Sequence, residues 1–252
     1  MTRVLVAVAE PSEVRELIRA GHVIAALWGA DTVAVHVNES SSAEMVTELR
    51  QQGATLELHS GDPCSVVAAL GSRDDVAAVV LGSGGDGLRT HLSRFTRTLV
   101  TELPTPLLVV PPGSVTGLRR VLVPLNDGAH ATPALARWLG ALRSSGAELR
   151  LLHLRALAAD EAYAACVDRE PRAGRLWGDE LPARFPRGAP AGELVREVGP
   201  PVEEIVDRCR PDVADLVVFS WSQTPEDGHA PVVAEALARS RIPVLLLVDE
   251  QA

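Results

Sequence analysis

A cluster of glycines follows an apolar stretch about a third of the way along the chain, in VVLGSGGDGLRTHL (residues 79–92). Glycine lets backbone N–H groups approach an anion closely, and a helix that begins after such a turn places the positive end of its dipole there. Strand, glycine turn and helix start together are typical of a phosphate-binding loop. A purely structural interpretation is also open, because glycines permit a sharp turn from a buried strand into the next helix.

No other residues in the sequence have the spacing of a catalytic or metal site. There is no H-x-x-x-H, no G-x-S-x-G, no P-loop ending in Gly-Lys-Ser/Thr, and no G-x-G-x-x-G after the first apolar run. The three cysteines, Cys64, Cys166 and Cys209, lie far apart, which favours buried thiols over a disulfide framework or a zinc site. We therefore expect no catalytic residues, no metal and no enzymatic activity.

Composition restricts the class of protein. Hydrophobic residues make up 46% of the 252 positions, yet no apolar run approaches the roughly 18 residues of a membrane span. The start of the chain, MTRVLVAVAEPSE, turns polar too early for a signal peptide. A formal net charge of −9, with no lysine among the 24 basic residues, argues against nucleic-acid binding. These features predict a cytoplasmic globular protein with neither a membrane nor a nucleic-acid partner.

The sequence repeats itself. RVLVAVAE (3–10) returns as RVLVPLND (120–127), GADTVAVHV (29–37) as GAELRLLHL (146–154), and VVLGSG (79–84) as VVFSWS (217–222). The offset between copies rises along the chain, which indicates an insertion of about 21 residues in the second copy, between residues 155 and 198. Its DREPRAGRLWGDELPARFPRGAPAG composition favours loop. The predicted organisation is a first domain at 1–112, a linker at 113–118 and a second domain at 119–252.

Each copy alternates short apolar runs with longer amphipathic segments. In the first copy the runs are 4–8, 32–37, 55–58, 76–81 and 106–110. Runs that are apolar at nearly every position are typical of parallel strands buried on both faces, and the segments between them are long enough for crossover helices. The predicted fold class is α/β: two tandem doubly wound domains, each a five-stranded parallel sheet flanked by helices.

Paired positions also predict structural roles. His36 and His153 recur at the end of the second strand of each copy, which favours a structural role near the sheet edge over a catalytic pair. The acidic pairs Asp74–Asp75 and Glu203–Glu204 are expected to be solvated surface.

The order of these segments resembles a tandem member of the universal stress protein family. The resemblance rests on RVLVAV and RVLVPL, strands ending in HV or HL, GDP and GPP helix starts, ADLVVFS, and the closing LPTPLLVVP and RIPVLLLV. It covers both halves except the insertion. It implies that the two halves pair within the chain much as two subunits pair in single-domain members, and it implies a role in stress or regulation.

In ATP-binding members of that family, an Asp after the first strand contacts the adenosine portion. A Gly, two residues, Gly, nine residues, Gly, Ser/Thr pattern after the fourth strand wraps the phosphates and ribose. Here Ala9 stands at the Asp position, and neither Phe95–Thr96 nor the alternative alignment Ser93–Arg94 supplies the third glycine. The resemblance thus marks a vestigial nucleotide loop, whose residues are Gly82, Ser83, Gly85, Gly87 and Thr96.

Charge around this loop is mixed. Asp86 would repel a polyphosphate, whereas Arg89 or Arg94 could contribute positive charge to an anion held by the N–H groups of residues 83–87.

The second copy departs further from the family pattern. Asn126, followed by Asp127, stands at the Asp position, while Ser220 and Gln223 replace Gly82 and Gly85. Glu226 and Asp227 would repel phosphate there. Trp221 could stack on an aromatic ligand at the sheet edge, but we favour a role in capping a core or filling an interface. With Trp177 and the insertion, it makes the second half a candidate docking surface.

The leading hypothesis is a non-enzymatic protein with no cofactor, which acts through an unidentified protein partner or through a ligand other than ATP. The alternative is an ATP- or AMP-binding stress regulator that uses the first-half glycine loop. A third interpretation is a small-molecule enzyme with its site around Trp177 and Trp221, but the sequence contains no group of catalytic residues that would support it.

Overall fold

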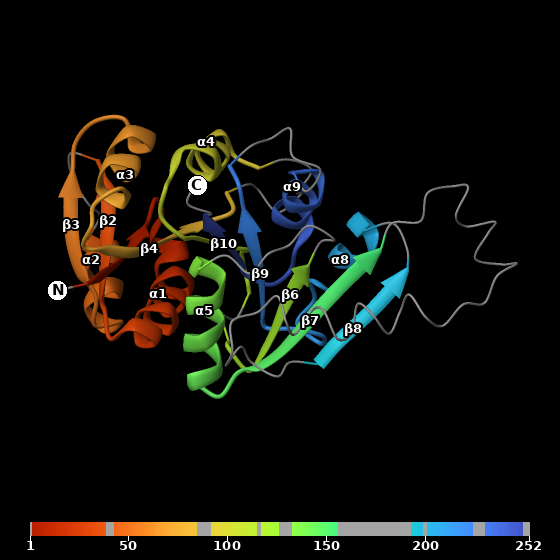
Figure 1. Cartoon of the computed structure of the whole chain (residues 1–252). Coiled ribbons are helices and arrows are strands. Elements are labelled where there is room, and N and C mark those ends of the chain that lie inside the picture. The colour runs from red at the N-terminus through yellow and green to blue at the C-terminus, as the bar shows by residue number, and fades with distance from the viewer. Residues whose placement is uncertain are drawn as a thin grey trace, which may run out of the picture.

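Ten strands of the described chain form one sheet. The computed structural model in Figure 1 shows helices on both faces of this sheet. The structure describes residues 2–38, 43–84, 92–114, 117–125, 133–155, 193–198, 201–223 and 230–248. The elements of the first half are β1 (Arg3–Ala7), η1 (Pro11–Glu13), α1 (Val14–Trp28), β2 (Asp31–Val37), α2 (Ala43–Gln51), β3 (Thr55–His59), α3 (Pro63–Gly71), β4 (Val76–Gly82), α4 (Arg94–Glu102) and β5 (Leu107–Val110).

The second half contributes the other five strands. Its elements are β6 (Arg120–Leu125), α5 (Pro133–Ser144), β7 (Glu148–Arg155), β8 (Glu193–Val198), α8 (Pro201–Arg208), β9 (Leu216–Trp221), α9 (Ala230–Arg239) and β10 (Val244–Val248). The predicted strands of the first copy are all present, with ends within one residue of those expected from the apolar runs.

The strand order is β3-β2-β1-β4-β5-β10-β9-β6-β7-β8, so both halves have the same order, read outward from the centre of the sheet. Neighbouring strands within each half are parallel, as expected for buried apolar runs. The halves meet at one antiparallel pair, β5 with β10, in which Leu108 lies opposite Leu245. We call this pair the seam. The α/β fold class is thus confirmed, and the two five-stranded sheets are joined into one.

Strand register supports the alignment of the two copies. Leu5 lies opposite Val79, and Leu122, its counterpart in the repeat, lies opposite Val217. Val217 is therefore the counterpart of Val79, and Ser220 the counterpart of Gly82.

Strand β8 is the third strand of the second half, and no residue range was predicted for it. It follows directly after the Pro- and Gly-rich stretch of the predicted insertion and pairs with β7. Its sequence, ELVREV, contains three charged and three apolar residues, and the strand lies at the edge of the sheet. Residues 156–192, including Trp177 and Cys166, lie outside the described residues.

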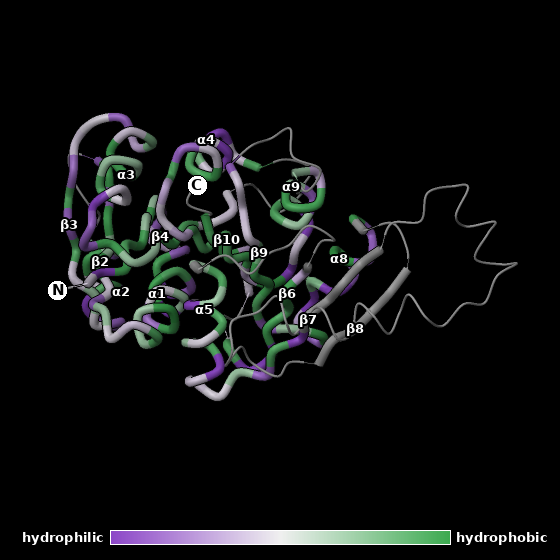
Figure 2. Tube along the Cα trace, viewed as in Figure 1, coloured by the Kyte–Doolittle hydropathy of each residue, from purple (hydrophilic) through white to green (hydrophobic). Residues whose placement is uncertain are grey.

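Each face of the sheet has one hydrophobic core that runs through both halves. Helices α1, α2 and α5 cover one face, and α3, α4, α8 and α9 cover the other. Figure 2 shows hydrophobic residues concentrated in the central strands and on adjoining parts of the helices. On the first face Trp28 of α1 and Trp138 of α5 meet edge to face, with ring centroids 5.1 Å apart. The halves are therefore joined by packing as well as by the seam.

An Arg–Asp ion pair recurs at the start of each half. Arg3 begins β1 and pairs with Asp75, 3.0 Å away, while Arg120 begins β6 and pairs with Asp215 at the same distance. Each Asp directly precedes the strand next to the arginine's own, so the pair ties two neighbouring strand starts together. The expectation that Asp75 is merely solvated was wrong, because Arg73 and Arg3 both contact its carboxylate.

Candidate functional site

The first-half glycine turn begins where β4 leaves the sheet. The Ser83 N–H donates to the Val110 carbonyl at 3.0 Å, which keeps the chain attached to β5 for one residue beyond β4. Gly84 then adopts a left-handed conformation with φ +62°. Gly85, Asp86, Gly87 and Arg89 lie outside the described residues, so their predicted roles stay predictions.

Helix α4 begins beside this turn. Ser93 is its N-cap, and its hydroxyl oxygen accepts the Thr96 N–H at 3.0 Å. Thr96 has no exposed surface, and its Oγ1 lies 3.4 Å from both the Gly82 and the Ser83 carbonyl oxygens. The Thr96 hydroxyl therefore fastens the helix to the turn instead of facing outward to a ligand.

Two further side chains change the environment of the turn. Phe95, which in one of the two alignments stands at the third glycine of the nucleotide pattern, packs against the hydrophobic core of the α4 face. Ser83 is 3% exposed, and its hydroxyl has no hydrogen-bond partner within the part of the chain that the structure describes. The structure thus brings Gly82, Ser83 and Thr96 together, but the threonine hydroxyl is already engaged within the protein.

An acidic side chain that sequence reasoning missed also lies at this edge. Ala9, at the family's Asp position, is exposed and offers no polar side chain. Glu13 of η1 places its Oε1 3.4 Å from the point where a Cβ on Gly82 would stand. A carboxylate so close to the end of β4 disfavours an anionic ligand there. Its position after the first strand was visible in the sequence, but its approach to Gly82 depends on how η1 turns.

At the corresponding end of β9 in the second half, two side chains form hydrogen bonds with the first half of the protein. Trp221 is 5% exposed, and its indole N–H donates to the Val100 carbonyl of α4 at 2.9 Å. The side-chain amide of Gln223 donates to the Leu103 carbonyl at 2.6 Å. The interpretation of Trp221 as an interface residue is thus confirmed in preference to ligand stacking. Residues 126–132 and 224–229, with Asn126, Asp127, Glu226 and Asp227, lie outside the described residues.

His36 has the structural role that its position predicted. It is 7% exposed, and its Nδ1 lies 2.8 Å from the Val8 carbonyl oxygen, so the ring joins the ends of β2 and β1. For its counterpart His153 the structure describes only the backbone, within β7.

Both described cysteines are free thiols, Cys209 buried and Cys64 partly buried. Burial raises the pKa of the Cys209 thiol to about 12, and it also raises the pKa of Cys64. Among the described residues no three His, Cys, Asp or Glu side chains are grouped so that they could hold a metal ion.

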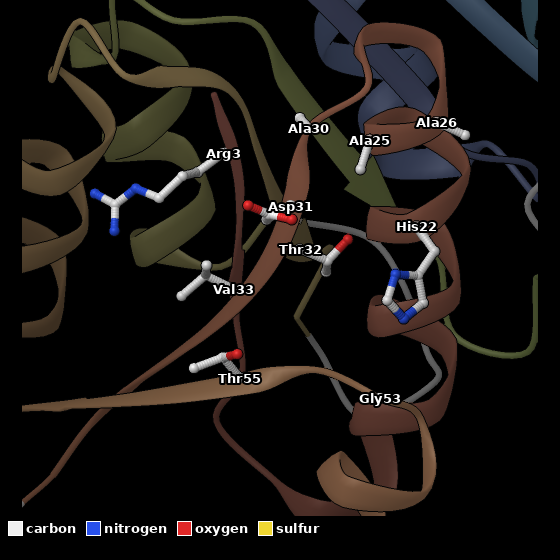
Figure 3. A pocket seen from close by; sticks show the side chains of 10 residues that line it. All are labelled: Arg3, His22, Ala25, Ala26, Ala30, Asp31, Thr32, Val33, Gly53 and Thr55. Carbon is white, nitrogen blue, oxygen red and sulfur yellow. The ribbon is translucent and has the colours of Figure 1, made fainter. Parts of the chain in front are cut away.

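A cavity of about 710 Å³ lies at the opposite, amino edge of β1, β2 and β3. Figure 3 shows the Arg3 guanidinium directed away from His22, so these polar groups do not converge. Arg3 is paired with Glu57 and Asp75, while the His22 Nε2 lies 2.8 Å from the Gln52 carbonyl oxygen. Arg3 and His22 are therefore engaged within the protein, whereas the Thr32 hydroxyl, which also lines the cavity, is buried without a hydrogen-bond partner among the described residues.

Comparison with known proteins identifies the family. The model of the universal stress protein family matches residues 117–247, slightly more than half of the chain. None of the curated proteins matches this sequence. Among the described residues, no helix combines the length and the apolar character that crossing a membrane requires.

Three solved structures share the fold over nearly the whole chain. A functionally unknown protein from Pseudomonas aeruginosa PAO1 has a TM-score of 0.68 and 16% identity, and the match covers 99% of this chain and 93% of that one. A putative universal stress protein from Pseudomonas aeruginosa UCBPP-PA14 has a TM-score of 0.68 and 15% identity, with 98% and 93% covered. A universal stress protein from Archaeoglobus fulgidus DSM 4304 has a TM-score of 0.65 and 15% identity, with 98% of each chain covered. The chain belongs to the universal stress protein family.

Proposed function

We propose that this chain is a non-enzymatic regulatory or binding protein that acts through contacts with a protein partner or through a ligand other than ATP. In this proposal residues 1–112 and 119–252 are two domains that pair within one chain, and the protein works in the cytoplasm. The shared strand order of the two halves and the repeated Arg–Asp pair support the tandem arrangement.

One observation carries the proposal: the Thr96 hydroxyl, which the family pattern would turn toward a nucleotide, is buried against the carbonyl oxygens of the glycine turn. To reach a ribose or phosphate it would have to release these contacts and expose a buried side chain. The Glu13 carboxylate beside Gly82 adds an electrostatic cost for a polyphosphate.

Calorimetric titration of the nucleotide-stripped chain with ATP at millimolar magnesium tests this proposal. We expect no saturable heat. Saturable binding with micromolar affinity and about one site per chain would overturn it and would leave the glycine turn as the site.

An ATP- or AMP-binding regulator remains the second candidate, because one observation favours it. The Ser83 hydroxyl is buried without a partner in the described part of the chain, beside a glycine in the left-handed conformation. In this alternative the backbone N–H groups after Ser83, in the predicted 83–87 segment, hold the phosphates, because the Ser83 N–H already donates to Val110. Gly85→Asp would then abolish the titration signal, whereas an unchanged affinity would exclude this loop as the site.

A further inference from the structure

Helix α4 lacks a backbone donor at its C-terminal end. In a regular helix the Val100 carbonyl would accept from the N–H four residues later, but that residue is Pro104, which has none. Leu103, which precedes this proline, is already extended with φ −83° and ψ 117°. Because Val100 is 7% exposed, an unpaired carbonyl there would be costly.

The second half supplies the missing donors. The Trp221 indole N–H donates to the Val100 carbonyl at 2.9 Å, and the Gln223 amide donates to the Leu103 carbonyl at 2.6 Å. Gln223 holds φ +61° and is the one non-glycine residue in a left-handed conformation among those described. Such backbone strain persists where the surrounding contacts require it. Here the hydrogen bond from the Gln223 side-chain amide to the Leu103 carbonyl is such a contact.

The other end of α4 carries the candidate site of the first half. Ser93 and Thr96 lie in its first turn, and the Thr96 hydroxyl contacts the Gly82 and Ser83 carbonyls. Since α4 has nine residues, its two ends lie only about 13 Å apart. A helix this short has little stability of its own, so opening at one end increases opening along its whole length.

We propose that the segment Trp221–Gln223 is a positioning device for α4, through which the second half controls the geometry of the first-half glycine turn. It stands where the second half would have its own glycine loop, because Ser220 is the counterpart of Gly82. The proposal goes beyond the proposed function, since it holds whether or not either turn binds a ligand.

The arrangement is specific to one side of the molecule. In the second half the counterpart of Pro104 is Arg241, as the strand pairings Val79–Leu107 and Val217–Val244 indicate. Arg241 has a backbone N–H, which donates to the Cys209 carbonyl at 3.0 Å. This N–H bonds to Cys209 and not to the carbonyl of Leu237, the counterpart of Val100, so α4 differs from α9 in having both the proline and the indole donor.

Amide hydrogen exchange on the full-length chain tests this inference without any ligand. Trp221→Phe removes the indole donor and keeps an aromatic ring, and Gln223→Met removes the amide donor at similar length. Trp28→Phe is the matched control, since Trp28 joins the two halves through the core on the other face of the sheet. We expect protection of the α4 amides, including Thr96 and Arg97, to fall about tenfold in Trp221→Phe while α1 is unchanged.

The NMR shift of the Thr96 amide proton provides a local readout, because this N–H is bonded to the Ser93 hydroxyl at the far end of the helix. We expect the chemical shift of this proton to change in the Trp221→Phe or Gln223→Met chain and to be unchanged in Trp28→Phe. If Trp221→Phe fails to fold, Gln223→Met decides alone. Unchanged protection of α4, or equal loosening of α1 and α4 in a chain that is merely less stable, would overturn the inference.

Discussion

At the scale of single residues, the Thr96 hydroxyl beside the glycine turn forms hydrogen bonds within the protein. Thr96 bonds to Ser93 and to the turn, and Glu13 of η1 approaches Gly82. Gly84 is the residue on which this packing depends most directly. A Cβ there would stand 2.8 Å from the Ser93 Cβ, closer than two carbon atoms can pack.

Gly84→Ala is expected to destabilise the chain by about 2–3 kcal/mol, from the left-handed backbone and from the collision with Ser93. Gly113→Ala is the control, because Gly113 has φ +72° but no atom lies within 4 Å of the point where its Cβ would stand. It should cost about 1 kcal/mol, the backbone cost alone. Urea denaturation measures both changes, and equal losses would show that Ser93 does not crowd Gly84.

At the scale of elements, the strands could be predicted because each needs a local pattern only. A run such as VAAVVLG (76–82) is apolar at nearly every position, since helices cover both faces of the sheet. The position of β8 was not predicted, because charged residues interrupt the apolar ones in ELVREV, which directly follows a Pro- and Gly-rich stretch. The start of α3 could also be predicted from a local pattern, because the GDP stretch contains Asp62, the N-cap of that helix.

Asp62→Ala is expected to lower the urea midpoint at neutral pH, while Asp62→Asn should retain most of the stability, because both Asp and Asn cap helices well. The Ser65 backbone N–H and then its hydroxyl bond to the Asp62 carboxylate and hold its pKa below the usual value. The carboxylate's advantage over Asn is thus present above about pH 4 and is lost as the pH falls through the folded-state pKa. A difference between native and Asp62→Asn chains that grows on acidification would contradict this account.

At the scale of the whole molecule, the candidate site residues could be placed from the sequence but their contacts could not. The sequence placed Thr96 beside the glycine turn and Trp221 at an interface, yet the partner of Trp221 lies 121 residues away in α4. No local pattern encodes such a contact, because it depends on the seam that brings the two halves together. The same holds for Trp28 and Trp138, whose rings meet only after the sheet has formed.

Because both cores cross the seam, we expect the two halves to unfold together. Leu108 and Leu245 are fully buried and lie opposite each other in the seam. Replacing either by Ala should cost about 2–5 kcal/mol and lower hydrogen-exchange protection equally in β1 and β6. Leu58→Ala on the exposed side of β3 is the matched control and should change little, since Leu58 is 49% exposed. Separate transitions for the two halves would refute this expectation.

The seam also removes a restriction that symmetry imposes. When two identical subunits meet about a two-fold axis, every residue on one side of the contact recurs on the other, so a change at the interface is made twice. In this chain β5 and β10 differ in sequence, and Pro104 on one side faces no proline counterpart on the other. The second half therefore carries a tryptophan where the first half keeps its glycines. The contact is asymmetric, because Trp221 and Gln223 of the second half donate the hydrogen bonds and α4 of the first half accepts them.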